Sequence, residues 1–176
     1  VLSLTMTAQE SFKEYSLGGI SVVTEPGKSQ GDVYIDLNAS GELGLSLNRN
    51  KRNEFLTFLR ESHNQIVEWS NIATANNVLE AKKDVTTTSL GGYFRYGGWN
   101  FGISKLTSKF VVQEGKTRGY VYIHKMTSSS NQYIKSDSDL FYLTEELVME
   151  LEEYLSDESI DGFVHSETKS DDLFKN

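Results

Sequence analysis

Cations and aromatic rings alternate along the stretch from Gly91 to Lys125. Six Lys and Arg side chains in that stretch face a single acid, Glu114, although the whole chain has a net charge of −8. A β-sheet face with both rings and cations suits single-stranded nucleic acid, because bases stack on rings while phosphates pair with positive charges. The same pattern also fits an ordinary sheet with rings in the core and cations on the wet face.

Eleven residues of this stretch are candidate nucleic-acid contacts. The rings predicted to stack on bases are Tyr93, Tyr96, Trp99, Phe101, Tyr120 and Tyr122. The cations predicted to neutralise phosphates, and so to make affinity fall with salt, are Arg95, Lys105, Lys109, Lys116 and Arg118. Because successive side chains of a strand point to opposite faces, we expect only about half of these residues to share one face. Arg49, Lys51 and Arg52 would extend the groove or be merely solvated.

Charge is divided unevenly along the chain. Residues 1–137 contain fifteen Lys and Arg against thirteen Asp and Glu, a balance of +2, whereas residues 138–176 contain two Lys against twelve acids, a balance of −10. This asymmetry indicates a neutral-to-basic binding body with an acidic appendage. The appendage is expected to repel nucleic acid or to occupy the basic groove when that groove is empty, or else simply to aid solubility.

Residue patterns typical of catalysis and metal binding are missing from the sequence. The chain has no cysteine, and His63, His124 and His165 lie apart without a second ligand at metal-binding spacing. Neither a Gly-x-Ser-x-Gly elbow, a phosphate loop nor a dinucleotide fingerprint is present. We therefore expect a non-catalytic protein with no cofactor and no metal. Without a signal peptide or an apolar run of about 18 residues, a cytoplasmic or other intracellular location is expected.

Hydrophobic periodicity predicts an α+β fold of antiparallel β-meanders, each followed by one helix. One helix is expected to begin near Asn48 or Asn50, with Phe55, Leu59, Ile66, Trp69 and Ala73 on its apolar stripe, and a second to begin after the cap Thr144. The expected strands are 17–24, 32–37, 42–47, 85–90, 93–96, 99–106, 109–113, 119–126 and 140–143, with a hairpin turn at 114–116.

Two segments of the chain repeat the same order of elements, which indicates a single domain built of two halves. The segment from Tyr34 and the segment from Tyr133 both begin Tyr-Ile and then run through a strand, a cap and a helix. The halves are expected at residues 1–77 and 85–158, with a crossover at 78–84 and an acidic tail at 159–176.

This order of strands and helix, present twice, resembles the Whirly and PUR families of single-stranded nucleic-acid-binding proteins. The resemblance implies sheets that present rings and cations to an extended strand, helices packed behind them, and self-association into a homo-oligomer. The chain departs from plant Whirly proteins because it lacks their Lys-Gly-Lys-Ala segment; the nearest cations are Lys13 and Lys28. The segment 171–174, Asp-Asp-Leu-Phe, is similar to the acidic tails with which bacterial and phage single-strand-binding proteins recruit partners, but it continues to Lys175 and Asn176.

The sequence thus predicts a non-catalytic protein that binds single-stranded DNA or RNA through the second-half sheet. The alternative is a viral or mobile-element structural protein that docks a protein partner through its acidic helix, tail and β-rich body. The sequence does not distinguish DNA from RNA.

Overall fold

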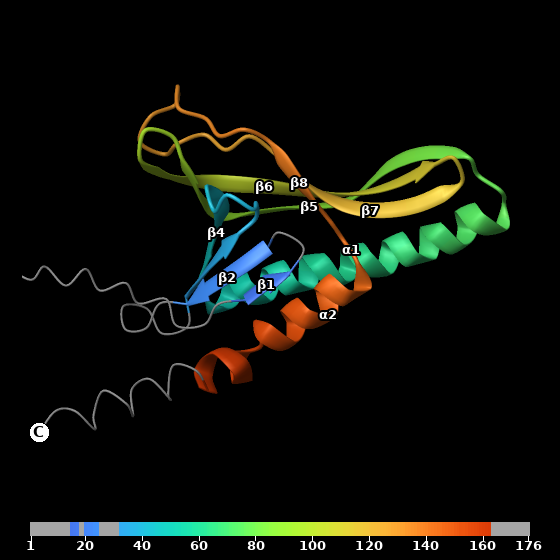
Figure 1. Cartoon of the computed structure of the whole chain (residues 1–176), viewed down its shortest axis with the longest axis horizontal. Helices are drawn as coiled ribbons and strands as arrows, with labels where there is room; N and C mark the ends of the chain where they lie inside the picture. The colour runs from blue at the N-terminus through green and yellow to red at the C-terminus, as the bar shows by residue number, and fades with distance from the viewer. Residues whose placement is uncertain (1–14, 18–19, 25–31, 163–176) are drawn as a thin grey trace, which may run out of the picture.

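The computed structural model of the chain describes residues 15–17, 20–24 and 32–162 (Figure 1). Residues 1–14 and the part of the acidic tail from residue 163 onward, including His165, lie outside the described residues. Two helices are present, α1 (Arg49–Ala75) and α2 (Glu145–Tyr154), and residues 157–162 are also helical. The strands are β1 (Tyr15–Leu17), β2 (Ile20–Thr24), β3 (Val33–Asp36), β4 (Leu43–Leu47), β5 (Glu80–Arg95), β6 (Trp99–Gln113), β7 (Lys116–Ile123) and β8 (Asp139–Tyr142).

All eight strands belong to one sheet, whose spatial order is the order of the strands in the chain. Every neighbouring pair is antiparallel, so the described chain forms a meander that α1 interrupts between β4 and β5. The order of four strands and a helix occurs twice, which confirms the predicted α+β class and the meanders that each end in a helix. Because β4 pairs with β5, the two meanders form one continuous sheet.

Several predicted boundaries differ from the structure. The crossover expected at 78–84 is wrong, because α1 runs to Ala75 and β5 already begins at Glu80, which leaves a connection of residues 76–79. The strands expected at 99–106 and 109–113 are one strand, β6. Residues 159–162, expected to belong to the tail, are helical, and Ile160 is fully buried. The prediction missed the start of β5 at residues 80–84, because the charged side chains there show little apolar alternation.

The helices begin where the sequence places their caps. Asn48 accepts a hydrogen bond from the backbone N–H of Lys51, and Thr144 accepts one from that of Leu147, so each satisfies an amide of the first turn. On α1 the predicted stripe packs against β4–β7, with Trp69 only partly buried against Phe110 and under Lys83. Both helices lie on one side of the sheet, and α2 packs along α1 (Figure 1).

An ion-pair cluster joins the first turn of α1 to the chain after α2. Arg52 is fully buried and donates a hydrogen bond of 2.6 Å to Asp157, whose other oxygen lies 2.9 Å from Arg49. Asp161 lies 3.4 Å from the same Arg49 nitrogen. The expectation that Arg49 and Arg52 extend a binding groove is therefore wrong, because both side chains are engaged by acids on the helix side of the molecule.

Acidification should weaken this cluster. The hydrogen bonds from Arg49 and then Arg52, with their charges, lower the pKa of Asp157 below its ordinary value of 3.8. A lowered folded pKa gives stability that is present above pH 3.8 and is lost as the pH falls through the folded value. We expect Asp157→Asn to lower the urea midpoint at pH 7, and this difference from the wild type to shrink towards pH 2. Asp161→Asn, which removes a longer and more exposed contact, should lower the urea midpoint less. If Asp157→Asn lowered the midpoint equally at pH 7 and at pH 2, the Asp157 ion pairs would not be the source of this stability.

Candidate nucleic-acid interface

The predicted contacts lie on one face of the sheet. Strand register pairs Arg95 with Trp99, Tyr93 with Phe101 and Lys109 with Tyr120 across adjacent strands, and directly paired residues point to the same face. By this parity, ten of the eleven candidates share the face opposite α1, and Tyr96 lies in the turn between β5 and β6. The expectation that only about half could share a face is wrong. It applied the alternation to the whole set, whereas the candidates within each strand are two or four residues apart and so share a face. The two-residue turn at Glu114 and Gly115, both with positive φ, keeps β7 in register with β6.

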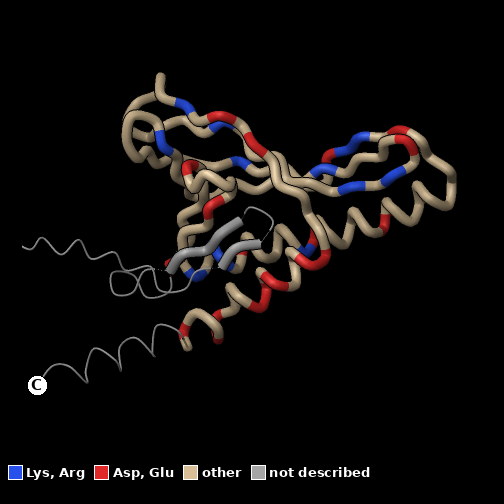
Figure 2. The backbone as a smooth tube through the Cα atoms, viewed as in Figure 1, with Lys and Arg blue, Asp and Glu red and all other residues tan. Residues whose placement is uncertain are grey.

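This face, here called the outer face, is opposite the helix layer. The inner-facing residues of β6, such as Leu106, Phe110 and Val112, are buried and belong to the main hydrophobic core. Figure 2 shows blue positions along β5–β7 and a concentration of red positions on α2, with some red positions on the strands and some blue positions on α1. β6 and β7 contain lysines and arginines but no acid, whereas α2 contains five glutamates and no base.

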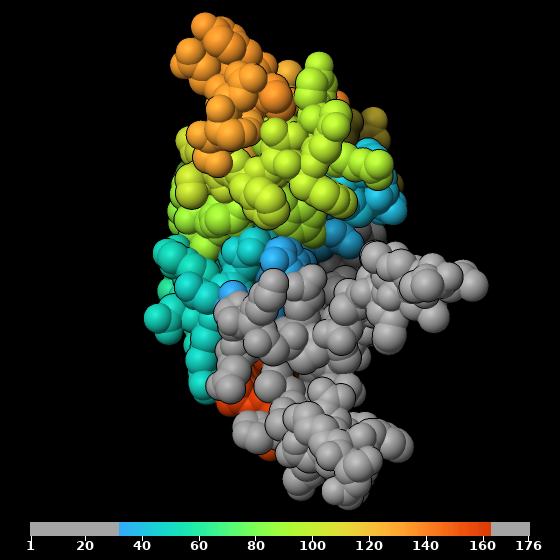
Figure 3. Space-filling view, turned by 90° about the vertical axis from the view of Figure 1, so that its left-hand side faces the viewer, coloured from blue at the N-terminus to red at the C-terminus, as the bar shows by residue number. Residues whose placement is uncertain are grey.

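One group of rings lies at the end of the β5–β6 hairpin. The Tyr93 ring makes edge contacts with Tyr34 at 5.9 Å and with Trp99 at 5.7 Å between centroids. Trp99 and Phe101 remain 57% and 53% exposed, and Arg95 lies over the Trp99 ring. Figure 3 shows this end of the molecule, where the segment around residues 95–105 (yellow-green) is open to solvent beside the 126–138 loop (orange).

Tyr93 supports the other rings of this group, but its own ring is too buried to stack on a base. Only 6% of the residue is exposed, and its hydroxyl donates a hydrogen bond to Asp36 on β3. Burial, followed by the hydrogen bond and the charge of Asp36, raises the pKa of Tyr93, so the hydroxyl stays protonated. Its predicted role as a base-stacking residue is therefore corrected to that of a support for Trp99.

A second group of rings lies across β7 and β8. Tyr120 and Tyr122 are partly buried, and their partners in β8, Tyr142 and Leu140, are 57% and 44% exposed. The sequence prediction missed Tyr142, as it missed Tyr34 and the exposed Ile103. Strand parity was the signal that could have found Tyr142, because Phe141 and Leu143 on either side of it are buried.

The cations of the outer face differ in availability. Lys109 forms an ion pair with Asp84 on the neighbouring strand, which lowers the pKa of that carboxyl and neutralises the lysine. Arg95, Lys105, Lys116 and Arg118 are exposed and have no ion pair within residues 32–162. These four are thus the side chains of the prediction best placed to meet phosphates.

His124 follows β7 and contacts two residues of the outer face. Its ring makes an edge contact with Tyr122 and a hydrogen bond of 2.8 Å with Thr107. Burial lowers the pKa of His124, and the positive charges of Lys105 and Lys109 lower it further against the opposing effect of Asp84. Burial is the largest of these causes, and the two lysines add to it.

The part of the chain that the structure describes contains no group of three or more His, Asp or Glu side chains that could hold a metal ion. Neither described helix has an apolar run long enough to cross a bilayer. Comparisons of the chain with protein-family models, curated proteins and solved structures found no match.

The position of the Tyr93 ring requires a glycine at position 44, so substitution of Gly44 should destabilise the protein. A Cβ atom at Gly44 would lie 2.3 Å from the Tyr93 hydroxyl and 2.4 Å from the carbonyl oxygen of Ile35, so ring or backbone must move. We expect Gly44→Ala to lower the free energy of unfolding by about 1–3 kcal/mol in urea titrations. Gly98→Ala is the control, because its Cβ would have no neighbour within 4 Å. Equal stability of the two variants would contradict this packing.

Proposed function

We propose that the protein binds single-stranded nucleic acid on the outer face, without catalysis. The observation that carries the proposal is the register that aligns the predicted rings and cations on the face opposite the described helices. Among the described residues, the exposed rings and the lysines and arginines beside them leave apolar area and positive charge unsatisfied. An unpaired base and its phosphate satisfy both at once.

The two ring groups lie at either end of a section of β6 that contains Lys105, and Lys116 and Arg118 lie beyond the second group. Along β6 the outer positions run from Trp99 and Phe101 through Lys105 to Lys109, where Tyr120 and Tyr142 lie alongside. The ten residue-to-residue steps of extended strand from Trp99 to Lys109 cover about 33 Å, enough for several nucleotides of a single strand. Such a surface favours an extended strand over a duplex, because stacking on side-chain rings requires bases that are not already stacked on each other.

The rival function is docking of a protein partner through the acidic helix, the tail and the β-rich body, and the acidic helix gives it less support. Two of the acids on that side are engaged within the chain, since Arg60 forms an ion pair with Glu152 and Arg49 with Asp161. Docking through the acidic helix makes no use of the outer-face alignment, although docking through the β-rich body would use it. Nucleic-acid binding accounts for the exposed rings together with the cations of β6 and β7.

Trp99→Ala should weaken binding of a fluorescent 12-nucleotide oligothymidylate measured by anisotropy. Loss of one stacked base costs about 1–3 kcal/mol, a factor of about 5 to 150 in Kd. Met149→Ala is the matched control, because Met149 is 61% exposed but lies on α2, on the helix side. Equal losses in the two variants, or no binding by the wild type at low salt, would exclude the outer face as the interface.

The salt dependence of binding should identify the phosphate contacts. Replacing Lys105 and Arg118 together with Gln should reduce the slope of log K against log salt by about 1.4, since each single-strand phosphate contact contributes about 0.7. The control, Lys51→Gln with Arg60→Gln, removes the same charge from α1. A slope that changes equally in both double variants would mean that only net charge matters, and that these two cations do not touch the strand.

A further inference from the structure

Among the residues that the structure describes, the edge of β7 is covered along only part of its length. β8 pairs with Tyr120–Ile123, the N–H of Leu143 donates to the carbonyl of Gly119 at 2.9 Å, and the chain then turns into α2 at Thr144. In an antiparallel strand, the N–H and C=O of every second residue point to the same edge. The backbone groups of Thr117 therefore face this edge, beyond the point where β8 ends.

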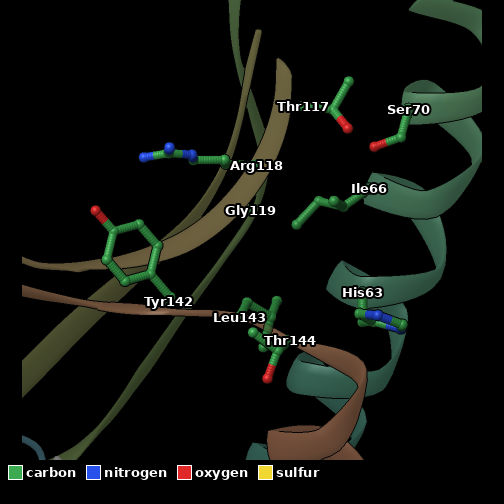
Figure 4. Close-up of a pocket in the computed structure, with 9 residues that line it drawn as sticks. All are labelled: His63, Ile66, Ser70, Thr117, Arg118, Gly119, Tyr142, Leu143 and Thr144. Atoms are coloured by element: carbon green, nitrogen blue, oxygen red, sulfur yellow. The ribbon is translucent and has the colours of Figure 1, made fainter. Parts of the chain in front are cut away.

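A groove of about 490 Å³ lies at this uncovered edge, between β7 and α1 (Figure 4). Its volume falls within the range of ligand-binding pockets in proteins. The residues that line it are His63, Ile66, Ser70, Thr117, Arg118, Gly119, Tyr142, Leu143 and Thr144.

The groove has one apolar side and one cationic side. Ile66 and Leu143 supply apolar surface, and Gly119 keeps β7 close to α1, because a Cβ there would lie 2.6 Å from Ile66. Figure 4 shows Arg118 and Tyr142 pointing away from α1, on the opposite side of β7 from Ile66 and Ser70. A chain lying along β7 would thus meet apolar surface on one face and the guanidinium of Arg118 on the other.

The other incompletely covered strand is less suited to pairing. β4 pairs only with Gly92–Phe94, which leaves the earlier part of β5 without a strand neighbour on that side. That part contains a bulge between Asp84 and Thr86 and the lysines at positions 82 and 83, features that prevent edge-to-edge pairing. The edge at Thr117 has no bulge, and it is the one that opens onto an apolar groove.

We propose that this groove binds an acidic peptide of a partner protein, which adds a short extended strand to β7 at Thr117. The peptide backbone bonds to the N–H and C=O of Thr117 and fixes the strand orientation. A bulky apolar side chain enters the groove against Ile66, while the carboxylate of an adjacent residue reaches Arg118 or Lys116, because neighbouring side chains of a strand point to opposite faces.

Charge and chemistry separate this occupant from two others. A second copy pairing through the same edge would bring its own Lys116 and Arg118 against this pair, and like charges repel. Nucleic acid offers no backbone amide for the edge of a strand, and the groove floor is apolar. An acidic peptide satisfies the edge, the apolar surface and the cations together.

The test uses the full chain and a blocked hexapeptide of alternating aspartate and leucine, followed by amide chemical shifts. We expect shifts at Thr117 and Gly119 that saturate, and none with a lysine–leucine hexapeptide of the same length. N-methylation of the leucine amides should abolish binding if strand addition holds the peptide. Binding of the lysine peptide, or undiminished binding of the methylated one, would overturn the proposal.

Two substitutions separate strand addition from general attraction. Thr117→Pro removes the N–H that faces the open edge, together with the threonine side chain, at a position where a strand tolerates proline, and should weaken peptide binding at least about tenfold. Thr117→Val, which keeps the N–H, should bind as the wild type does. Arg118→Glu should weaken binding more than Arg95→Glu, which makes the same charge change at the far end of the outer face. Unchanged affinity in Thr117→Pro, with an unchanged melting temperature, would overturn the proposal.

Three further outcomes would assign the groove to another occupant and overturn the proposal. A 12-nucleotide oligothymidylate that shifts Thr117 and Ser70, where the acidic peptide does not, would make the groove part of the nucleic-acid interface. Shifts at Thr117 on replacing Asp171 and Asp172 with Asn, with no peptide added, would identify the chain's own acidic segment. Shifts that depend on protein concentration alone would identify a second copy.

Discussion

The unbroken alternation of β6 is the constraint on which the rest of the structure depends. A strand of fifteen residues without a bulge of its own sends Leu106, Phe110 and Val112 to the helix layer, and it must send Trp99 and Lys105 the other way. A one-residue slip would place the lysine in the core and expose the leucine. Core formation therefore fixes the composition of the outer face, and the same register that stabilises the fold assembles the candidate interface.

Local signals predicted much of the fold. The caps Asn48 and Thr144, the stripe of α1 and the turn at Glu114 follow from short-range chemistry, such as an oxygen that accepts an amide proton or a glycine that takes a positive φ, and the structure has each of them. The first residues of β5, 80–84, are predicted as part of a crossover and the Thr-rich residues 85–90 as a strand, because the charged start of β5 lacks the apolar alternation by which strands are recognised.

The sequence alone does not show that the candidate residues share one face, because strand pairing determines this. Whether Lys105 and Lys109 share a face depends on whether the strand between them is continuous, and that is decided by pairing with β5 and β7. Long-range pairing also determines which cations remain available to a ligand. Arg52 resembles a surface residue in sequence, yet it is buried against Asp157, more than a hundred residues away, and Lys109 is matched by Asp84 on another strand.

Because each strand lies next to the strand before it in sequence, further strands could be added at the edge of the sheet without any change in the existing connections. A further unit of four strands and a helix could be appended beside β8 by the same kind of connection that joins α1 to β5 through residues 76–79. Tandem duplication of one such unit produces this architecture directly, since the copy needs only an open neighbouring edge on which to build. The two halves are then free to diverge, one towards structural support and the other towards ligand contact.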